Sequence, residues 1–375
     1  MERAFYRSLA GVCVTGLAVA AAQPPAAPPY ELPPTNPPPQ QPSEPMLPAT
    51  VEVDRAPAHS APAAGGKPKP KVTTKPYVRP ANEDERTKAA RLQAFLARAG
   101  FSPGLIDGKP GAKTKLALEE YTVAKGVDPT AAPEGSTVDA APVNTAAWTR
   151  TYKISEADGA LITGAIPTDW NERAALSVSG YESLQELLAE RGWCSQETVA
   201  WLNQSLTMSE LKVGDEVTLP DVPDPLTPGV KAVGLPKMAR VEVSLGAKAV
   251  RGYADAEGTQ QVSLMHCSIA RLVEKRPSGE LHVKVIATEP AYTFDPKDWP
   301  EVEGITTKLT IAPGPRNPVG AAWVGLDLPG YGMHGTVRPQ DIGKTGSHGC
   351  FRLFNWEAVR LARAVKVGTV VVVKE

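Results

Sequence analysis

Proline is distributed unevenly along this chain, and its distribution limits where the chain can fold. The sequence has 38 prolines in 375 residues, and 18 of them fall between Gln23 and Pro80. Runs such as Pro37-Pro38-Pro39 favour polyproline II, and the surrounding segment has too few apolar residues to bury a core. We therefore predict that residues 23–83 form a disordered, Pro-rich linker that acts as a tether.

The first 22 residues have the pattern of an export signal. Arg3 and Arg7 give a positive start, Leu9 to Val19 form a short apolar run, and Ala20-Ala21-Ala22 suits a signal peptidase. The apolar run is shorter than the roughly 20 residues that span a bilayer. We predict a signal peptide over 1–22 and an exported protein of the periplasm or cell wall, with an uncleaved signal anchor as the alternative.

Charge and cysteine content narrow the possible partners. The net charge is −1 and the pI is about 6.6, so the chain has no basic excess for a polyphosphate, and we predict no nucleic-acid partner. Removal of the signal would leave Cys194, Cys267 and Cys350. An odd number of cysteines in an exported protein leaves at least one thiol unpaired, whether or not the other two pair.

The chain's most specific motif surrounds Cys350. The sequence reads His334-Gly335-Thr336 and then Gly346-Ser347-His348-Gly349-Cys350-Phe351-Arg352. A thiol nucleophile needs a nearby base to form the thiolate and donors to hold the oxyanion that it creates. Zinc is the competing interpretation, but no second Cys or His pair stands at a metal-ligand spacing. We therefore predict a nucleophilic cysteine and no metal.

This arrangement resembles the active-site signature of the L,D-transpeptidases, the YkuD-type family. Its pattern is a first His-Gly, a spacer of more than ten residues, Ser/Thr-His-Gly-Cys, an apolar residue, and Arg or Asn. The sequence contains every part in order, and the resemblance covers residues 237–375. It implies a mainly-β, sandwich-like catalytic domain. Alternating apolar residues at Val241, Val243 and Leu245 agree with strands there.

The resemblance also implies a role for each residue of the motif. Cys350 is the expected nucleophile and His334 the base, with the Gly335 carbonyl orienting the imidazole. His348 is the second candidate for the base. Backbone N–H groups around Gly349 and Cys350 are expected to form the oxyanion hole, and no cofactor is implied. The residues expected to bind substrate are Arg352, Ser347, Gly349 and Tyr331.

The family's chemistry implies a function in cell-wall biogenesis. Its members cut the bond before the terminal D-Ala of a peptidoglycan stem peptide, form a cysteinyl thioester, and pass the acyl group to an amine. They are also acylated by carbapenems. The expected partners are stem peptides and glycan strands. An L,D-carboxypeptidase, a ligase that uses an envelope lipoprotein as acyl acceptor, and a non-catalytic wall-binding protein are the alternatives.

Two smaller modules are predicted before the catalytic domain. Residues 84–127 have apolar residues at helical spacing around Gly100-Phe101 and Ile106-Asp107-Gly108, and they resemble a small, helical peptidoglycan-binding domain. Residues 178–220 resemble a degenerate α+β LysM module, with helices over 181–193 and 196–203 before a short strand. Residues 128–177 are expected to be a linker or extension, and 221–236 a linker.

Two further expectations concern the catalytic domain itself. His282 alternates with Leu281 and Val283, so it is expected on the polar face of a strand and outside the site. Asn355 is a favourable capping residue and is expected to cap a helix from Trp356 to about Val365. Residues 368–373 then form the last predicted strand.

Overall fold

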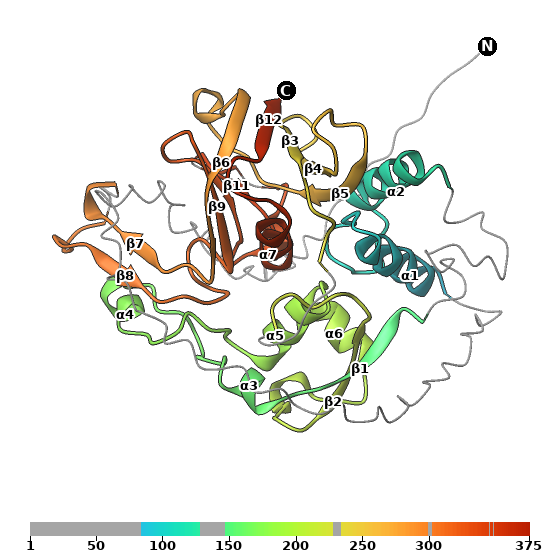
Figure 1. Ribbon diagram of the computed structural model, residues 1–375. Coiled ribbons are helices and arrows are strands. Elements are labelled where there is room, and N and C mark those ends of the chain that lie inside the picture. The colour runs from blue at the N-terminus through green and yellow to red at the C-terminus, as the bar shows by residue number, and fades with distance from the viewer. Residues whose placement is uncertain (1–83, 128–146, 228–233, 299–301, 345, 348) are drawn as a thin grey trace, which may run out of the picture. The chain divides into compact units, whose positions relative to one another are not determined.

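The computed structural model describes residues 84–127, 147–227, 234–298, 302–344, 346–347 and 349–375 (Figure 1). The chain divides into two units, Met1–Pro34 and Thr35–Glu375, and every described residue belongs to the second. The predicted signal peptide and Pro-rich linker lie outside the described residues, and so does His348. Within the described ranges, no helix has both the length and the apolar character needed to cross a membrane.

The C-terminal part is mainly β, as predicted. Eight of its described strands form one sheet in the order β11-β10-β9-β6-β12-β3-β4-β5, in which the pairs β12–β3 and β10–β11 are parallel and the others antiparallel. The strands are β3 (Arg240–Ser244), β4 (Ala249–Tyr253), β5 (Gln261–His266), β6 (Gly279–Thr288), β9 (Ala322–Leu326), β10 (Gly332–His334), β11 (Phe351–Arg352) and β12 (Val370–Lys374).

The long strand β6 makes this sheet continuous, where the sequence predicted a sandwich-like arrangement. Its first residues, 279–282, pair with β12, and its residues from Val283 onward pair with β9. The register shifts between Val283 and Val285, where one half of the sheet passes into the other. A strand of ten residues can join two halves that shorter strands would leave as separate layers.

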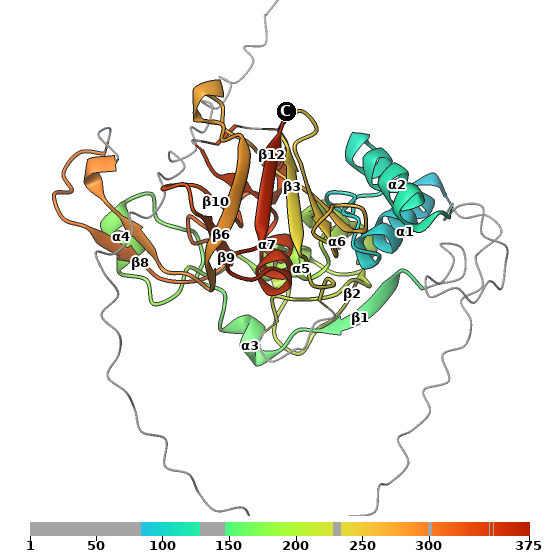
Figure 2. The same cartoon turned by 45° about the horizontal axis from the view of Figure 1, so that its top comes forward.

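Helix α7 (Asn355–Ala364) closes the core of this domain. Ala358, Val359 and Leu361 pack with Val241, Val324 and other apolar residues, and every strand of the sheet contributes to this cluster. Figure 2 shows α7 lying against the strands in the middle of the sheet. The helix begins one residue earlier than predicted, and the prediction that Asn355 caps it is wrong. Phe354 precedes the helix, and the side chain of Asn355 bonds elsewhere.

A second module precedes the sheet and begins earlier in the sequence than predicted. Strand β1 (Thr149–Lys153) pairs antiparallel with β2 (Glu216–Pro220), and helices lie between them. Residues 128–177 therefore include a strand where only a linker or extension was expected. Strand β1 is polar and has no buried residue, so it lacks an apolar pattern, whereas β2, the predicted short strand, buries Val217 and Leu219. The helices are α3 (Glu156–Gly159), α4 (Trp170–Ala174), α5 (Leu184–Arg191) and α6 (Gln196–Leu202).

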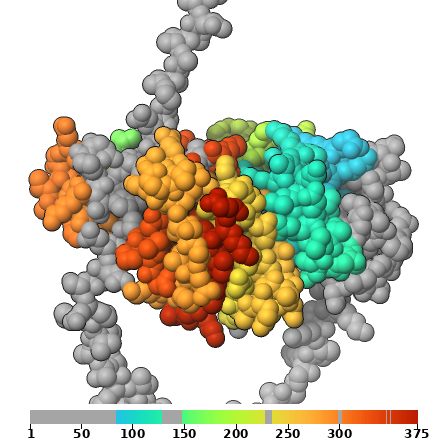
Figure 3. Space-filling model, turned by 90° about the horizontal axis from the view of Figure 1, so that it is seen from above, coloured from blue at the N-terminus to red at the C-terminus, as the bar shows by residue number. Residues whose placement is uncertain are grey.

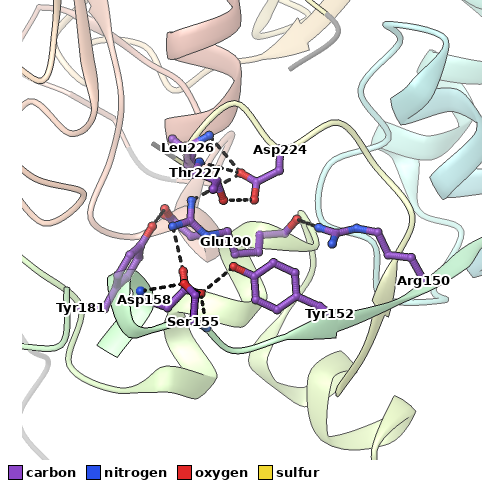
Figure 4. Close-up of polar contacts among 10 residues, drawn as sticks. Arg150, Tyr152, Ser155, Asp158, Tyr181, Glu190, Asp224, Leu226 and Thr227 are labelled. Carbon is purple, nitrogen blue, oxygen red and sulfur yellow. Dashed lines mark hydrogen bonds and ion pairs between the residues drawn. The ribbon is translucent and has the colours of Figure 1, made fainter. Parts of the chain in front are cut away.

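A buried ion-pair network fixes this module. Arg191, which is fully buried at the end of α5, pairs with Asp158 at 3.2 Å and with Asp224 at 3.4 Å. Tyr152 and Ser155 donate to the Asp158 carboxylate, and these hydrogen bonds, together with Arg191, lower its pKa despite burial. Figure 4 shows Asp158 and Asp224 approaching from two segments of the module. Paired in this way, the buried charges join β1, α3, α5 and the segment after β2.

The region of residues 84–127 contains two helices, α1 (Glu85–Arg98) and α2 (Ala112–Lys125). Their apolar residues pack together with Ala249 and Leu264 of the large sheet. Phe101 forms a bridge with Leu264, and Arg251 of β4 pairs with Glu120 of α2. The space-filling view shows α2 directly beside the segment that contains β3 to β5 (Figure 3). These helices therefore share a core with the sheet.

The remaining elements are short. Strands β7 (Tyr292–Phe294) and β8 (Leu309–Ile311) form a separate antiparallel pair, against which α4 packs. Four 3-10 turns complete the described secondary structure: η1 (Met208–Glu210), η2 (Val273–Lys275), η3 (Pro296–Asp298) and η4 (Pro339–Asp341).

Candidate active site

The pairing of β10 with β11 brings the two parts of the predicted signature together. The strands run parallel, with Met333 opposite Phe351 and His334 opposite Arg352. Met333 and Phe351 both point into the main core. Because side chains alternate along a strand, the residues on either side of this pair face the opposite side. That face therefore carries His334 from one strand and Cys350 and Arg352 from the other.

The segment before Cys350 is held on its other edge by residues 268–271. Ser347 N–H donates to the Ile269 carbonyl at 2.6 Å, and Arg271 N–H donates to the Ser347 carbonyl at 2.8 Å. Ser347 also closes the turn itself, since its hydroxyl donates to the Cys350 carbonyl and accepts from Gly349 N–H. The hydroxyl predicted to bind substrate therefore already stabilises the turn. Because Gly349 N–H is bonded to it, Cys350 N–H is the predicted oxyanion donor that is left.

His334 is oriented by its own neighbour, in the way that the family resemblance implied. Its Nδ1 lies 2.7 Å from the Gly335 carbonyl, which can only accept, so Nδ1 carries the proton and Nε2 is left as the basic atom. The ring stacks on Trp323, with 5.5 Å between centroids. Burial, followed by the charge of Arg352, lowers the pKa of His334 to about 4. The imidazole is therefore neutral at physiological pH and able to accept a proton.

Cys350 is buried among aromatic and aliphatic side chains. Its exposed fraction is 4%, and it belongs to an apolar cluster that includes Trp323, Tyr292 and Val319. The thiol donates to the Gly330 carbonyl at 3.5 Å. Burial raises the pKa of Cys350 to about 12, although a backbone hydrogen bond and Arg352 act in the opposite direction. The resting thiol is therefore protonated.

Arg352 places a buried positive charge beside the nucleophile. Its exposed fraction is 5%, and its Nε is buried without a hydrogen-bond partner in the described part of the chain. Burial lowers the pKa of Arg352 to about 10, and the charges of Cys350 and Asp341 oppose this shift. A guanidinium held in this way can attract a carboxylate or stabilise a thiolate.

Of the other predicted residues, some lie beside Cys350 and others do not. Tyr331 lies against Gly349, because a Cβ on that glycine would stand 3.2 Å from the Tyr331 ring. The pKa of Tyr331 is raised by burial and by the nearby charge of Cys350. Tyr331, Gly349 and Cys350 are thus neighbours. His348 lies outside the described residues, so its role as the second candidate for the base stays a prediction. His282 pairs with Asp327 at a half-exposed position, away from this face.

The sequence reasoning missed two residues that shape the site. Trp323 covers the His334 ring, and Asn355 lies beside the peptide of Gly335, where a Cβ on Gly335 or Gly320 would collide with its side-chain oxygen. The two glycines near the motif were the available signal, since a glycine is required wherever another group approaches the backbone this closely. Cys194 and Cys267, whose pairing the sequence left open, are both free and buried.

The comparisons with known proteins agree with this geometry. Residues 239–373 match the L,D-transpeptidase catalytic domain of the YkuD family. This match agrees with the mainly-β fold of the C-terminal part of the chain, and members of the matched family act on peptidoglycan. The match covers 36% of the chain, as 135 of 375 residues, and it leaves the earlier modules unassigned.

Relatives carry the same family name at low to moderate identity. The chain is 38% identical over 105 residues to YqjB of Bacillus subtilis, covering 26% of this chain and 52% of that protein. It is 25% identical over 188 residues to YkuD of Bacillus licheniformis, covering 50% of this chain and 91% of that protein. Both relatives are named as L,D-transpeptidases only provisionally. The chain thus spans about half the length of the first of them.

Among solved structures, a cysteine-to-serine mutant of the Enterococcus faecium L,D-transpeptidase is similar in structure, and the similarity covers 37% of this chain and 50% of that protein's chain. The two are 17% identical, and the TM-score is 0.28.

Proposed function

We propose that the protein is a peptidoglycan L,D-transpeptidase that works through a thioester on Cys350. The observation that carries this proposal is the face shared by β10 and β11. It presents a protonated thiol, a neutral imidazole and a guanidinium together, with the imidazole Nδ1 tied to the Gly335 carbonyl. This combination suits acyl transfer, which needs a nucleophile, a base of fixed tautomer and a positive charge near the reacting group.

The proposed first step forms the acyl-enzyme. Nε2 of His334 takes the thiol proton as the Cys350 sulfur attacks the carbonyl of the stem residue before the terminal D-Ala. The C–N bond then breaks, the proton passes from His334 to the departing amine, and D-Ala leaves. In the second step an amine of another stem loses a proton to His334 and attacks the thioester, which restores the thiol and forms the cross-link.

Arg352 is proposed to hold a carboxylate of the donor stem. Its guanidinium is nearly buried, has an unpaired Nε and lies on the face of the nucleophile. A carboxylate that enters the site would supply the missing partner and place the scissile carbonyl near Cys350. The same burial implies that substrate must displace residues around Tyr331 and Gly330 to reach the sulfur, since Cys350 is 4% exposed.

Two other proposals concern where the reaction takes place and how the chain reaches its substrate. We propose that the protein is exported through residues 1–22, because peptidoglycan lies outside the cytoplasm. The segments 84–127 and 178–220 are proposed to contact the wall, in accordance with their resemblance to peptidoglycan-binding and LysM modules.

Mass spectrometry of muropeptides tests the proposal. The purified mature chain is incubated with disaccharide-tetrapeptides, and Cys350→Ala serves as the matched inactive control. Cross-linked dimers with loss of D-Ala are expected from the wild type alone. Tripeptides without dimers would mean that water is the acceptor, and linkage to an added lipoprotein would identify a ligase. If neither product nor a carbapenem adduct on Cys350 forms while the chain still binds sacculi, the proposed catalysis is refuted and a wall-binding function replaces it.

A further inference from the structure

A buried glutamate of the module before the catalytic domain bonds to the residue that lies beside the catalytic histidine's peptide. Glu190 is on α5, near its end, and is 5% exposed. Its carboxylate accepts two hydrogen bonds from the Asn355 amide, at 2.9 and 3.3 Å, and one from the Tyr181 hydroxyl at 2.9 Å. Figure 4 shows Tyr181 and Glu190 next to the ion pairs of Asp158.

The opposite end of the Asn355 amide acts on the catalytic strand. Its Oδ1 accepts from Ala321 N–H at 3.0 Å and fits against the backbone of Gly320 and Gly335 so closely that neither could carry a Cβ. Its Nδ2 also donates to the Pro315 carbonyl at 3.0 Å. Asn355 is completely buried, so its amide has no solvent to exchange with and its orientation is set by these partners.

Gly335 connects this amide to the reaction. The carbonyl of Gly335 accepts the hydrogen bond from His334 Nδ1, which fixes the imidazole tautomer. A shift of the Gly335 peptide would therefore turn the base away from the thiol or free its tautomer. The contacts run without a gap from Glu190 through Asn355 and Gly335 to His334.

We propose that Glu190 is a positioning residue for catalysis, which acts through Asn355 to hold the Gly335 carbonyl against His334. The module of residues 147–227 is then part of the catalytic apparatus, because Glu190 supplies one of the two acceptors of the Asn355 Nδ2, beside the Pro315 carbonyl. This inference rests on the proposed function for its kinetic test, but the state of the imidazole can be measured independently of activity.

The same contacts explain why a costly carboxylate is kept at this position. An isolated buried carboxylate is strongly unfavourable, and burial raises the pKa of Glu190 to about 7. The groups that face it are Tyr181 and Asn355 as donors, with Glu186 and Arg191 as the nearby charges. Two donors converge on it, and glutamate or glutamine can accept from both, whereas an apolar side chain would deprive one Asn355 N–H and the Tyr181 hydroxyl of this acceptor.

The test measures acylation of Cys350 by imipenem in the full chain, together with the ¹⁵N chemical shifts of the His334 ring. Glu190→Ala should slow acylation by roughly 10- to 100-fold, as a misplaced catalytic group does, and should weaken the Nδ1–H signature. Glu190→Gln keeps an acceptor for Asn355 and should retain most of the rate. The control Glu186→Ala removes a neighbouring ion pair to Arg316 without touching Asn355 and should leave both readouts unchanged.

If Glu190→Ala does not fold, a second pair of variants tests the same contact by exchanging the donor and the acceptor between positions 355 and 190. Asn355→Asp keeps the acceptor for Ala321 but opposes Glu190 with a second carboxylate, so acylation should fall. Adding Glu190→Gln gives the aspartate a donor and should restore part of the rate. The inference is overturned if the double variant is no faster than Asn355→Asp, or if Glu186→Ala is as slow as Glu190→Ala. It is also overturned if the ¹⁵N chemical shifts of the His334 ring are the same in Glu190→Ala as in the wild type. A wild type that is not acylated, but whose ring shifts respond to Glu190, would refute the proposed function alone.

Discussion

The thiol and imidazole of this site should rest as a neutral pair, and pH is the perturbation that reveals it. The pKa of Cys350 is raised to about 12 and that of His334 is lowered to about 4, chiefly because both are buried. Before their mutual attraction is counted, moving the proton from sulfur to nitrogen spans about 8 pKa units, on the order of 10 kcal/mol. A resting thiolate–imidazolium pair is therefore disfavoured.

This difference predicts an unusual acid limb for acylation. At pH 5.5 an imidazole with a pKa of about 4 is about 97% neutral, whereas one with an ordinary pKa of about 6.5 is about 9% neutral. Acylation by imipenem should thus be nearly as fast at pH 5.5 as at pH 7.5 and should decline only as pH approaches 4. An ordinary histidine would lose about ten-fold over the same interval.

The assay is the initial rate of adduct formation by intact-protein mass spectrometry between pH 4.5 and 8, at constant ionic strength. The profile is repeated in Glu190→Gln, because the pKa of Glu190 is about 7 and its titration must not be assigned to His334. A half-maximal rate between pH 6 and 7 in both proteins would refute the reasoning. It would mean that the imidazole is hydrated in the working enzyme or that the pair rests as ions.

Four substitutions have further expected outcomes. Cys350→Ala should abolish the adduct, and His334→Ala should slow its formation by about 10²–10⁴, as loss of a general base does; the same mass assay checks both. Arg191→Met leaves two buried carboxylates unpaired and should lower the free energy of unfolding by about 3–5 kcal/mol, measured by urea denaturation. Burial raises the pKa of Glu357 to about 8, above its unfolded value of 4.5, so the stability from this group is present below pH 4.5 and is lost as pH rises to 8. Glu357→Gln should flatten the fall of Tm over that range, and an unchanged slope would contradict this assignment.

The sequence was most informative where the determining interactions are local. The signature around His334 and Cys350 predicted the family, and the turn it contains is closed by Ser347, three residues before the nucleophile. Helices α5 and α6 lie within two or three residues of their predicted ends, because an apolar stripe and serine N-caps mark them. Such signals need no knowledge of distant parts of the chain.

The predictions that were wrong involve strand-pairing or hydrogen-bonding partners that are far apart in sequence. Strand β1 pairs with residues more than sixty positions later, and its own five residues are too polar to signal a strand. Asn355 has the composition of a helix cap, but its best donors and acceptors come from Glu190, 165 residues away, and from Ala321. Local capping preference is worth about 1 kcal/mol, so several buried hydrogen bonds override it.

Asn355 also shows why the modules of this chain cannot be treated as independent. The amide lies at the start of α7, and its hydrogen bonds come from the loop before β9 and from α5. Phe354 and Trp356 on either side of it belong to the apolar cluster of the earlier module, where Trp356 stacks on Trp193. Removing that module would expose these rings and leave the Asn355 Nδ2 with only the Pro315 carbonyl as its acceptor. The sheet carries His334 and Cys350, but the contacts around the Gly335 peptide, which bonds to His334, are completed by a segment outside the matched domain.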